Sequence, residues 1–446
     1  MEKYDVVVIG SGPGGAAAAY ALKDGGKRVA LVEDDLWGGT CPNRGCDPKK
    51  MLVSGMEVME RNNQMLGRGF SLIESIDWPE LMAFKRSYTD PFPRSFKKGV
   101  EAYGIDAIEG SARFVGDNRI EAGDAVIEAD AFVIATGQRP SILGIEGSEH
   151  LLTSTDFLDM DELPKRMAFL GAGYIAFELA AIANAAGSEV TIVHHNDRPL
   201  KGFDSDLVDS LVEAYEDRGI SFAFDVDIEA IAEDERGYLL RGRGSGDREY
   251  VERFDCVVGA TGRIPNVEAL DLENAHVDYD GHGITVDGFL QTSNPAVYAC
   301  GDVVAKKAPK LTPTASFEGA YLARRILGSA AEPLAYPPIV SIVYGSPKLA
   351  QVGVSPAEAA ERDGSYKLDE MDLTNWFTYR RIGEPVSKVK LVHEGDRLVG
   401  ASALSSQADA LINHLAILID NAIVHEDFNR MILGSPTLAS DLPSLV

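Results

Sequence analysis

Cysteine is scarce in this chain. The sequence has only four among 446 residues, at positions 41, 46, 256 and 300. So few cysteines exclude the disulfide-rich scaffold of small secreted proteins, and they favour a reducing, cytoplasmic setting in which a close pair is more often catalytic. A second cysteine pair or a histidine cluster that could complete a zinc site with Cys41 and Cys46 is also missing. We therefore expect no metal site.

Basic charge and long apolar runs are lacking too. Forty-two basic residues face sixty-nine acidic ones, and the formal net charge is −27. This balance argues against nucleic acid or an anionic membrane as a partner. The apolar run at residues 6–9 has only the length of a strand, and later apolar stretches contain charges or glycines. We therefore expect neither a signal peptide nor a membrane span.

A pair of thiols stands out against this background. Residues 38–50 read Gly-Gly-Thr-Cys-Pro-Asn-Arg-Gly-Cys-Asp-Pro-Lys-Lys. If the chain enters a helix after Cys41, both cysteines can lie on one face within disulfide reach, with Cys46 a turn further in. A redox pair and two unrelated buried cysteines are both compatible with this spacing, and the surrounding motifs must decide between them.

The first of those motifs is a dinucleotide fingerprint. A predicted strand at residues 5–9 is followed by Gly-Ser-Gly-Pro-Gly-Gly at 10–15, a helix at 16–22, and a second strand that ends at Glu33. Gly10 permits the tight turn, Gly12 lets a pyrophosphate approach the backbone, and Gly15 lets the helix meet the strand. Glu33 can accept hydrogen bonds from ribose hydroxyls. The Cys pair follows Glu33 closely and should lie near this cofactor.

The fingerprint occurs a second time. A strand at 166–170 leads into Gly171-Ala172-Gly173-Tyr174-Ile175, a helix to residue 186, and a strand at 189–193. Here the acid is replaced by His194, with Arg198 and Lys201 nearby. Cations suit a 2′-phosphate, so we expect NADP at this site, with NAD as the alternative. His194 or Lys201 could equally be a solvated surface residue.

Two further strands end in a Thr-Gly pair, at Ala135-Thr136-Gly137 and at Thr261-Gly262-Arg263. Such a turn at the carboxyl edge of a parallel sheet is where cofactor contacts are expected, although it can also be a plain strand exit. Together these motifs predict an α/β protein with two Rossmann-like βαβ dinucleotide-binding domains. A length of 446 residues allows about three domains.

With two dinucleotide folds, a C-x4-C pair after the first, and Cys300-Gly301-Asp302 further on, the chain resembles the class I pyridine nucleotide-disulfide oxidoreductases. Within that family it is most similar to glutathione reductase, and it also resembles dihydrolipoyl dehydrogenase and mercuric reductase. The resemblance implies an FAD-binding domain at 1–145 that resumes at 269–332, an NAD(P)-binding domain at 146–268, and an α+β dimerisation domain at 333–446. A homodimer is therefore expected.

The resemblance also implies an electron relay from NADPH through FAD to a disulfide of Cys41 and Cys46. Cys46 would be the charge-transfer thiol that faces the flavin, and Cys41 the interchange thiol that attacks the substrate. Lys49, with Lys50 as the alternative, would pair with Glu178 near the flavin, and Tyr174 would cover the nicotinamide pocket. The catalytic candidates are Cys41, Cys46, Lys49, Glu178 and Tyr174. The cofactor-binding candidates are Gly10, Gly12, Gly14, Gly15, Glu33, Gly39, Thr40, Lys50, Ala135, Thr136, Gly137, Gly171, Gly173, Tyr174, Ile175, His194, Lys201, Gly262, Arg263, Gly301, Asp302 and Thr312.

The sequence departs from the family pattern at three positions. Ser435 and Ser440 stand where the family has a catalytic histidine and its carboxylate partner. A serine cannot exchange protons near pH 7, so the leaving thiol must be protonated by another group, for example His414. Asp47 replaces an aliphatic residue beside Cys46. If it points inward, its charge opposes thiolate formation.

The expected activity is therefore reduction of a small-molecule disulfide by NADPH through FAD and the Cys41–Cys46 pair. The missing dyad leaves open an NAD(P)H-dependent flavin reductase of the same fold that acts on a metal ion, a quinone or oxygen. A flavin-bound redox sensor without turnover is a third alternative.

Overall fold

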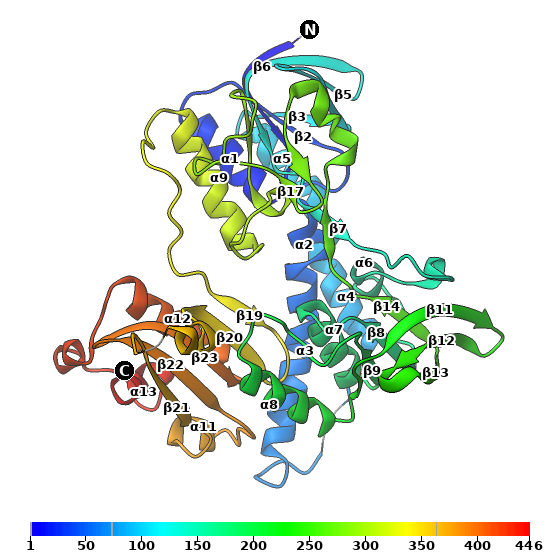
Figure 1. Cartoon of the computed structure of the whole chain (residues 1–446), viewed down its shortest axis with the longest axis vertical. Helices are drawn as coiled ribbons and strands as arrows, with labels where there is room; N and C mark the ends of the chain where they lie inside the picture. The colour runs from blue at the N-terminus through cyan, green and yellow to red at the C-terminus, as the bar shows by residue number, and fades with distance from the viewer. Residues whose placement is uncertain (1, 73–74, 363) are drawn as a thin grey trace. The chain divides into compact units, whose positions relative to one another are not determined.

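The computed structural model describes residues 2–72, 75–362 and 364–446. Its helices are α1 (Pro13–Asp24), α2 (Thr40–Arg44), α3 (Cys46–Met65), α4 (Trp78–Thr89), α5 (Phe92–Ala102), α6 (Ser154–Phe157), α7 (Tyr174–Ala185), α8 (Ser205–Glu216), α9 (Thr312–Ile326), α10 (Pro356–Glu361), α11 (Phe377–Arg380), α12 (Ala408–Asp420) and α13 (Leu438–Leu445) (Figure 1). The described chain forms two compact units. Unit 1 contains the described residues of 1–49, 83–141 and 262–335, and unit 2 those of 50–82, 142–261 and 336–446.

Unit 1 is built on a seven-stranded sheet. Its strands are β1 (Glu2–Ile9), β2 (Val29–Glu33), β3 (Asp106–Glu109), β4 (Ala112–Gly116), β5 (Arg119–Ala122), β6 (Ala125–Ile134) and β18 (Val297–Ala299). The parallel part runs β3-β2-β1-β6, with β18 parallel to β6 on the far side, and β5 and β4 extend the sheet in the antiparallel sense. Parallel strands are buried on both faces, which explains the continuous apolar run in β1.

The two faces of this sheet carry separate cores. Val6 and Val8 of β1 pack with Ala18 and Leu22 of α1, whereas Val7 lies in the core on the other face. A Cβ added to Gly319 of α9 would lie 2.1 Å from the carbonyl oxygen of Gly14 in α1, so these two helices approach closely. The pairing of β7 (Gln138–Pro140) with β15 (Arg263–Pro265) completes the unit, together with a small hairpin of β16 (Tyr279–Asp280) and β17 (Gly283–Ile284).

Unit 2 contains three sheets. The parallel sheet has the order β10-β9-β8-β14, formed by β8 (Arg166–Leu170), β9 (Glu189–Val193), β10 (Ser221–Ala223) and β14 (Cys256–Gly259). An antiparallel sheet joins β11 (Asp227–Asp234), β12 (Gly237–Gly244) and β13 (Arg248–Phe254). The third has the order β19-β20-β23-β22-β21, with β19 (Ser341–Val343), β20 (Lys348–Gly353), β21 (Lys367–Asp372), β22 (Lys388–Glu394) and β23 (Arg397–Ser405).

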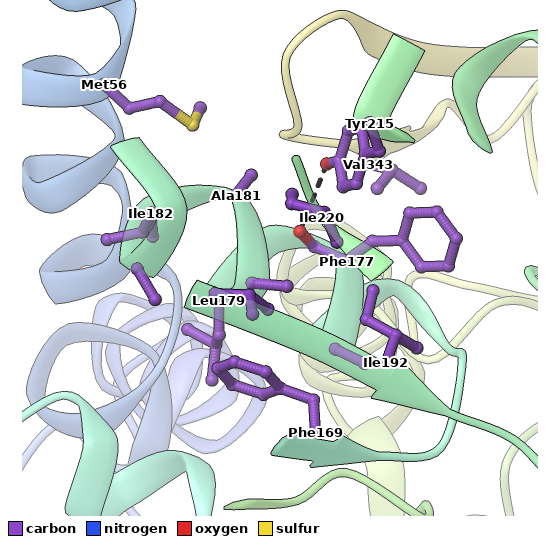
Figure 2. Packing of buried hydrophobic residues seen from close by; sticks show 14 of the residues in the cluster. Met56, Phe169, Phe177, Leu179, Ala181, Ile182, Ile192, Tyr215, Ile220 and Val343 are labelled. Carbon is purple, nitrogen blue, oxygen red and sulfur yellow. Dashed lines mark hydrogen bonds between the residues drawn. The ribbon is translucent and has the colours of Figure 1, made fainter. Parts of the chain in front are cut away.

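One hydrophobic core in unit 2 surrounds α7. Phe177 and Leu179 of this helix pack with Phe169 of β8 and Ile192 of β9, and the core reaches Val343 of β19 (Figure 2). The hydroxyl of Tyr215 in α8 donates a hydrogen bond to the backbone oxygen of Phe177 at 3.1 Å, drawn as a dashed line in Figure 2. These contacts fix α7, the helix of the second fingerprint, against β8, β9 and α8.

One local prediction needs correction. The helix expected from Cys41 onward is interrupted at Gly45, so that α2 and α3 are separate helices. Gly110, whose φ is 144°, lies between β3 and β4. Pro91 lies between the end of α4 and the start of α5. Every helix within the described ranges is too short or too polar to span a bilayer.

Candidate active site

The first fingerprint forms a turn between β1 and the N-terminus of α1. A Cβ on Gly15 would lie 1.9 Å from the carbonyl oxygen of Gly10, so only glycine allows this approach of helix and strand. A Cβ on Gly12 would meet nothing nearer than the Cα of Gly39, at 3.9 Å. The backbone of Gly12 therefore lies next to Gly39 at the N-terminus of α1, where the backbone N–H groups of a helix suit a pyrophosphate.

Glu33 at the end of β2 is held by the same turn. Its Oε2 accepts hydrogen bonds from the backbone nitrogen and the hydroxyl of Ser11, at 2.9 and 2.6 Å. The Ser11 hydroxyl in turn accepts from the nitrogen of Gly38 at 2.8 Å, in the segment that leads to Cys41. Sequence reasoning missed Ser11, because any residue fits the variable position of the fingerprint.

The Thr-Gly turn after β6 is joined to a second segment of unit 1. The Thr136 hydroxyl donates to the backbone oxygen of Asn266 at 2.7 Å, and the Asn266 side chain donates to the oxygen of Thr136 at 2.8 Å. The guanidinium of Arg263 donates to the backbone oxygen of Gln138. The side chains of Thr136 and Arg263 thus hold this edge of unit 1 together, while Ala135 and Gly137 provide its backbone.

Asp302 lies in a short 3-10 turn (Gly301–Val303) after β18. Burial raises the pKa of this carboxyl, and the positive charges of Lys306, Arg263 and Lys310 oppose the rise. Lys310 also donates to the backbone oxygen of Asp302 at 2.9 Å. The sequence motif identified Asp302, but the cations around it come from separate segments.

A buried ion pair supports this turn. Glu318 of α9 is fully buried; its Oε2 accepts from the nitrogen of Gly301 at 2.7 Å, and its Oε1 lies 2.5 Å from Nζ of Lys306. Because α9 begins at Thr312, the carboxylate ties the Gly301 turn to the helix that carries Thr312. Neither Lys306 nor Glu318 was predicted, although a charged residue on an otherwise apolar helix face was a usable signal.

Cys41 lies in α2 and Cys46 begins α3, and both are thiols in this structure. A Cβ on Gly45 would be 2.9 Å from the oxygen of Thr40 and 3.3 Å from the Cα of Cys41. The absence of a side chain at Gly45 lets the chain turn back tightly between the two helices, and this places the two thiols within hydrogen-bonding reach of each other.

The environment of the thiols is asymmetric. Thr312 Oγ1 lies 3.5 Å from Sγ of Cys46. The pKa of Cys41 is raised by the hydrogen bond with Cys46, by burial, and by the negative charges of Cys46 and Asp47, whereas Thr312 opposes the rise. Asp47 accepts a hydrogen bond from the hydroxyl of Tyr88 at 2.8 Å. At neutral pH this environment favours the protonated form of Cys41.

The residues of unit 1 fit an FAD. A glycine at the N-terminus of α1 (Gly12), a fixed carboxylate at Glu33, a buried acid at Asp302 and a hydroxyl at Thr312 next to a thiol form a donor and acceptor set for a dinucleotide with a redox-active ring. These residues come from five separate segments, yet all belong to unit 1.

Unit 2 carries the second fingerprint. Gly171 has a φ of +103°, and a Cβ on it would lie 2.5 Å from the oxygen of Ala260. Gly173 is the residue before α7, and a Cβ on it would meet nothing within 4 Å. Tyr174, the first residue of α7, is 42% exposed, and Ile175 follows it at the edge of the core. The arrangement repeats the glycine turn of unit 1, where Gly10 has a φ of +99° and a Cβ on it would lie 2.4 Å from the oxygen of Ala135.

The residues after β9 differ in charge and burial. Burial and the neighbouring His195 lower the pKa of His194, whose ring lies 4.4 Å from the His195 ring, so His194 is neutral at pH 7. Arg198 and Lys201 are exposed cations. The positive charge expected at this site is thus carried by these two residues and not by His194.

Glu178, in the second turn of α7, is 1% exposed, and its Oε1 accepts from the nitrogen of Tyr344 at 2.8 Å. Lys50 Nζ lies 4.7 Å from the centre of the Tyr344 ring. Lys49 belongs to unit 1 and Glu178 to unit 2. Their pairing therefore stays a prediction.

The two serines at the expected dyad positions, Ser435 and Ser440, have different structural surroundings. Ser440 takes part in the N-terminal cap of α13: its hydroxyl donates to the oxygen of Thr437 at 2.8 Å, and its nitrogen donates to the Thr437 hydroxyl at 3.2 Å. Ser435 is exposed. His414 lies on α12, where its Nδ1 is buried and has no hydrogen-bond partner within the described ranges.

The fold and these residues define a class: a redox protein with two dinucleotide-binding regions and a dithiol beside the first. Comparison with known proteins agrees. The family model for pyridine nucleotide-disulphide oxidoreductases matches residues 4–319, and that for the dimerisation domain of the same family matches residues 339–445.

Curated relatives cover nearly the whole chain. A glutathione reductase of Burkholderia cepacia is 34% identical over 451 residues, covering 100% of this chain and 99% of the relative. A mercuric reductase of Staphylococcus aureus is 30% identical, covering 98% of this chain and 81% of the relative. A dihydrolipoyl dehydrogenase of Haloferax volcanii is also 30% identical, covering 98% and 94%. The chain belongs to the pyridine nucleotide-disulphide oxidoreductase family and is a flavoprotein oxidoreductase that uses a nicotinamide nucleotide.

Proposed function

We propose that this protein is an NADPH-dependent, FAD-containing reductase of a small-molecule disulfide. The observation that carries the proposal is the Cys41–Cys46 dithiol, with Thr312 3.5 Å from Cys46, inside the unit that fits FAD. The glutathione reductase relative, which matches the chain along its full length, supports a thiol disulfide as substrate.

The dithiol accounts for the substrate half of the reaction. The Cys41 thiolate attacks one sulfur of the substrate disulfide, a mixed disulfide forms, and the first thiolate leaves and takes up a proton. The Cys46 thiolate then attacks Cys41 Sγ, the second thiol leaves, and the Cys41–Cys46 disulfide is formed. Two electrons have passed to the substrate. When bound, FAD supplies the two-electron chemistry that connects the nicotinamide nucleotide with this disulfide.

The preference for NADPH rests on the loop after β9. Glu33 closes the corresponding strand in the first fingerprint, whereas the second has Arg198 and Lys201 nearby. Cations there suit the 2′-phosphate of NADPH, and a carboxylate would repel it. The family's dimerisation domain at residues 339–445 supports a homodimer.

Protonation of the leaving thiol distinguishes the candidate functions. General acid and base catalysis is typically worth about 10²–10⁴ in rate, and neither Ser435 nor Ser440 can provide it. The second candidate function is reduction of an acceptor that releases no thiol to be protonated, such as a metal ion. The mercuric reductase relative supports this candidate.

The test is a panel of acceptors with purified holoenzyme and NADPH or NADH. Disulfides, quinones and metal ions are compared in the wild type and in Cys41→Ser. We expect disulfide turnover with NADPH that Cys41→Ser abolishes while flavin reduction persists. Dye and quinone turnover that is unchanged in Cys41→Ser, together with no reduction of any disulfide, would disprove the proposal.

A further inference from the structure

A carboxylate lies beside the dithiol. Asp47 follows Cys46 in the first turn of α3 and is half-buried. Its Oδ2 accepts a hydrogen bond from Tyr88 of α4 at 2.8 Å. This bond fixes the carboxylate near the thiols, and both residues belong to unit 1.

Aromatic rings continue from Tyr88 along α5. The Tyr88 and Phe92 ring centres are 5.6 Å apart, and those of Phe92 and Phe96 are 5.8 Å apart. Phe92 also packs on the segment that leads to Cys41: a Cβ on Gly38 would lie 2.6 Å from its ring and 3.1 Å from Pro42. The dithiol segment is therefore bordered by aromatic rings as well as by a carboxylate.

The charged groups around Cys41 make the electrostatic potential at its sulfur negative. The negative charge of Asp47 raises the pKa of Cys41, and the negative charges of Asp47 and Cys41 raise the pKa of Tyr88. Arg44, the cation in the same helix as Cys41, forms an ion pair with Asp35 at 2.8 Å. The Asp47 carboxylate attracts an ammonium group that approaches Cys41 and repels a carboxylate group.

We propose that Asp47, held by Tyr88, determines substrate specificity at Cys41, favouring a disulfide that carries an ammonium group near its S–S bond over one that carries carboxylates there. The inference rests on the proposed function and narrows its substrate class. Tyr88 acts through Asp47 as a positioning residue.

Steady-state kinetics provide the first test. Cystamine, 2-hydroxyethyl disulfide and 3,3′-dithiodipropionate are symmetrical disulfides with positive, neutral and negative ends. In Asp47→Asn we expect kcat/KM to fall about threefold to tenfold for cystamine and to rise by a similar factor for 3,3′-dithiodipropionate. Removal of one unit charge close to a charged substrate changes its binding by about this factor. The neutral disulfide should change little.

The chain offers a matched control. Asp24 at the end of α1 accepts a hydrogen bond from Tyr103 at 2.5 Å, so Asp24→Asn removes the carboxylate of another Asp–Tyr pair in unit 1. Its charge preference should equal that of the wild type. An equal change for all three disulfides in Asp47→Asn would overturn the inference, as would the same charge dependence in Asp24→Asn.

A second test needs no turnover. In a Cys46→Ser background, Cys41 is modified with a cationic or an anionic methanethiosulfonate, since Cys256 and Cys300 are buried. The cationic reagent should react faster, and adding Asp47→Asn should reduce the ratio of the two rates about threefold to tenfold. An unchanged ratio overturns the inference. If this ratio responds as expected but the holoenzyme reduces no disulfide, the field of Asp47 is real and the proposed function fails.

Discussion

Glu318 holds Lys306 at 2.5 Å in the interior of unit 1, where the two side chains are 0% and 8% exposed. The same carboxylate accepts the nitrogen of Gly301, next to Asp302. Glu318→Gln should leave the Lys306 charge buried without compensation, which typically costs about 3–5 kcal/mol. We expect a lower urea midpoint and faster release of FAD, followed by flavin fluorescence. Glu121→Gln, which breaks the exposed pair with Arg113, should change neither; equal effects of both substitutions would contradict this role.

Gly173→Ala should separate folding from nucleotide binding. A Cβ there meets nothing within 4 Å, so the variant should fold and retain FAD. The added methyl group occupies space at the start of α7 where a pyrophosphate is expected, so flavin reduction by NADPH should slow by about tenfold or more, measured by stopped flow. Gly171→Ala, with its strained φ and its contact with Ala260, should instead destabilise the protein. Normal reduction kinetics in Gly173→Ala would refute the assignment of this turn.

The nucleotide preference should depend on Lys201 and not on His194. Lys201→Ala removes a cation that suits a 2′-phosphate, so the KM for NADPH should rise while the KM for NADH stays the same. His194→Ala should affect both nucleotides alike. Because burial and the neighbouring His195 lower the folded-state pKa of His194, this side chain gains its proton at a more acidic pH than an ordinary histidine, and any strengthening of NADPH binding through it should be displaced to lower pH accordingly. Equal KM changes for NADPH and NADH in Lys201→Ala would contradict this prediction.

The reactivity of Cys41 should increase with pH. Its pKa is raised, first by the hydrogen bond with Cys46, so at neutral pH a smaller fraction of Cys41 is thiolate than in an ordinary cysteine. Iodoacetamide should modify Cys41 slowly at pH 7 and faster as pH rises, and Cys46→Ala should shift this profile to lower pH. Mass spectrometry of the modified peptide gives the rate at Cys41. A profile that Cys46→Ala leaves unchanged would exclude the hydrogen bond as the main cause.

Restoring the family dyad should test the missing proton donor directly. Ser440→Glu keeps the cap of α13, because Thr437 and a glutamate three residues later form a capping box. Adding Ser435→His to it should raise disulfide turnover by about tenfold or more if proton transfer limits the rate. Ser440→Glu alone serves as the control for folding. No gain in the double variant would indicate that another group, for example His414, already supplies the proton.

The sequence by itself determined the parts that depend on local spacing. Both fingerprints, the strand ends at Glu33 and Thr136, the thiol pair and the family follow from residues close together in the chain, because turns, helix starts and strand periods are local properties. The interruption at Gly45 was not recognised, since a helical pattern continues across it and only the close return to Thr40 and Cys41 requires the break.

Only the tertiary structure decided which groups surround the site residues that these motifs supply. Tyr88 bonds to Asp47 across 41 positions, Thr312 reaches Cys46 across 266, and Glu318 supports a turn 17 residues before it. The pKa of Cys41, the neutrality of His194 and the ion pair of Lys306 all depend on burial and on charges brought from other segments. The motifs fix which groups are present, whereas the protonation state of each group depends on the neighbours that folding brings within a few ångströms.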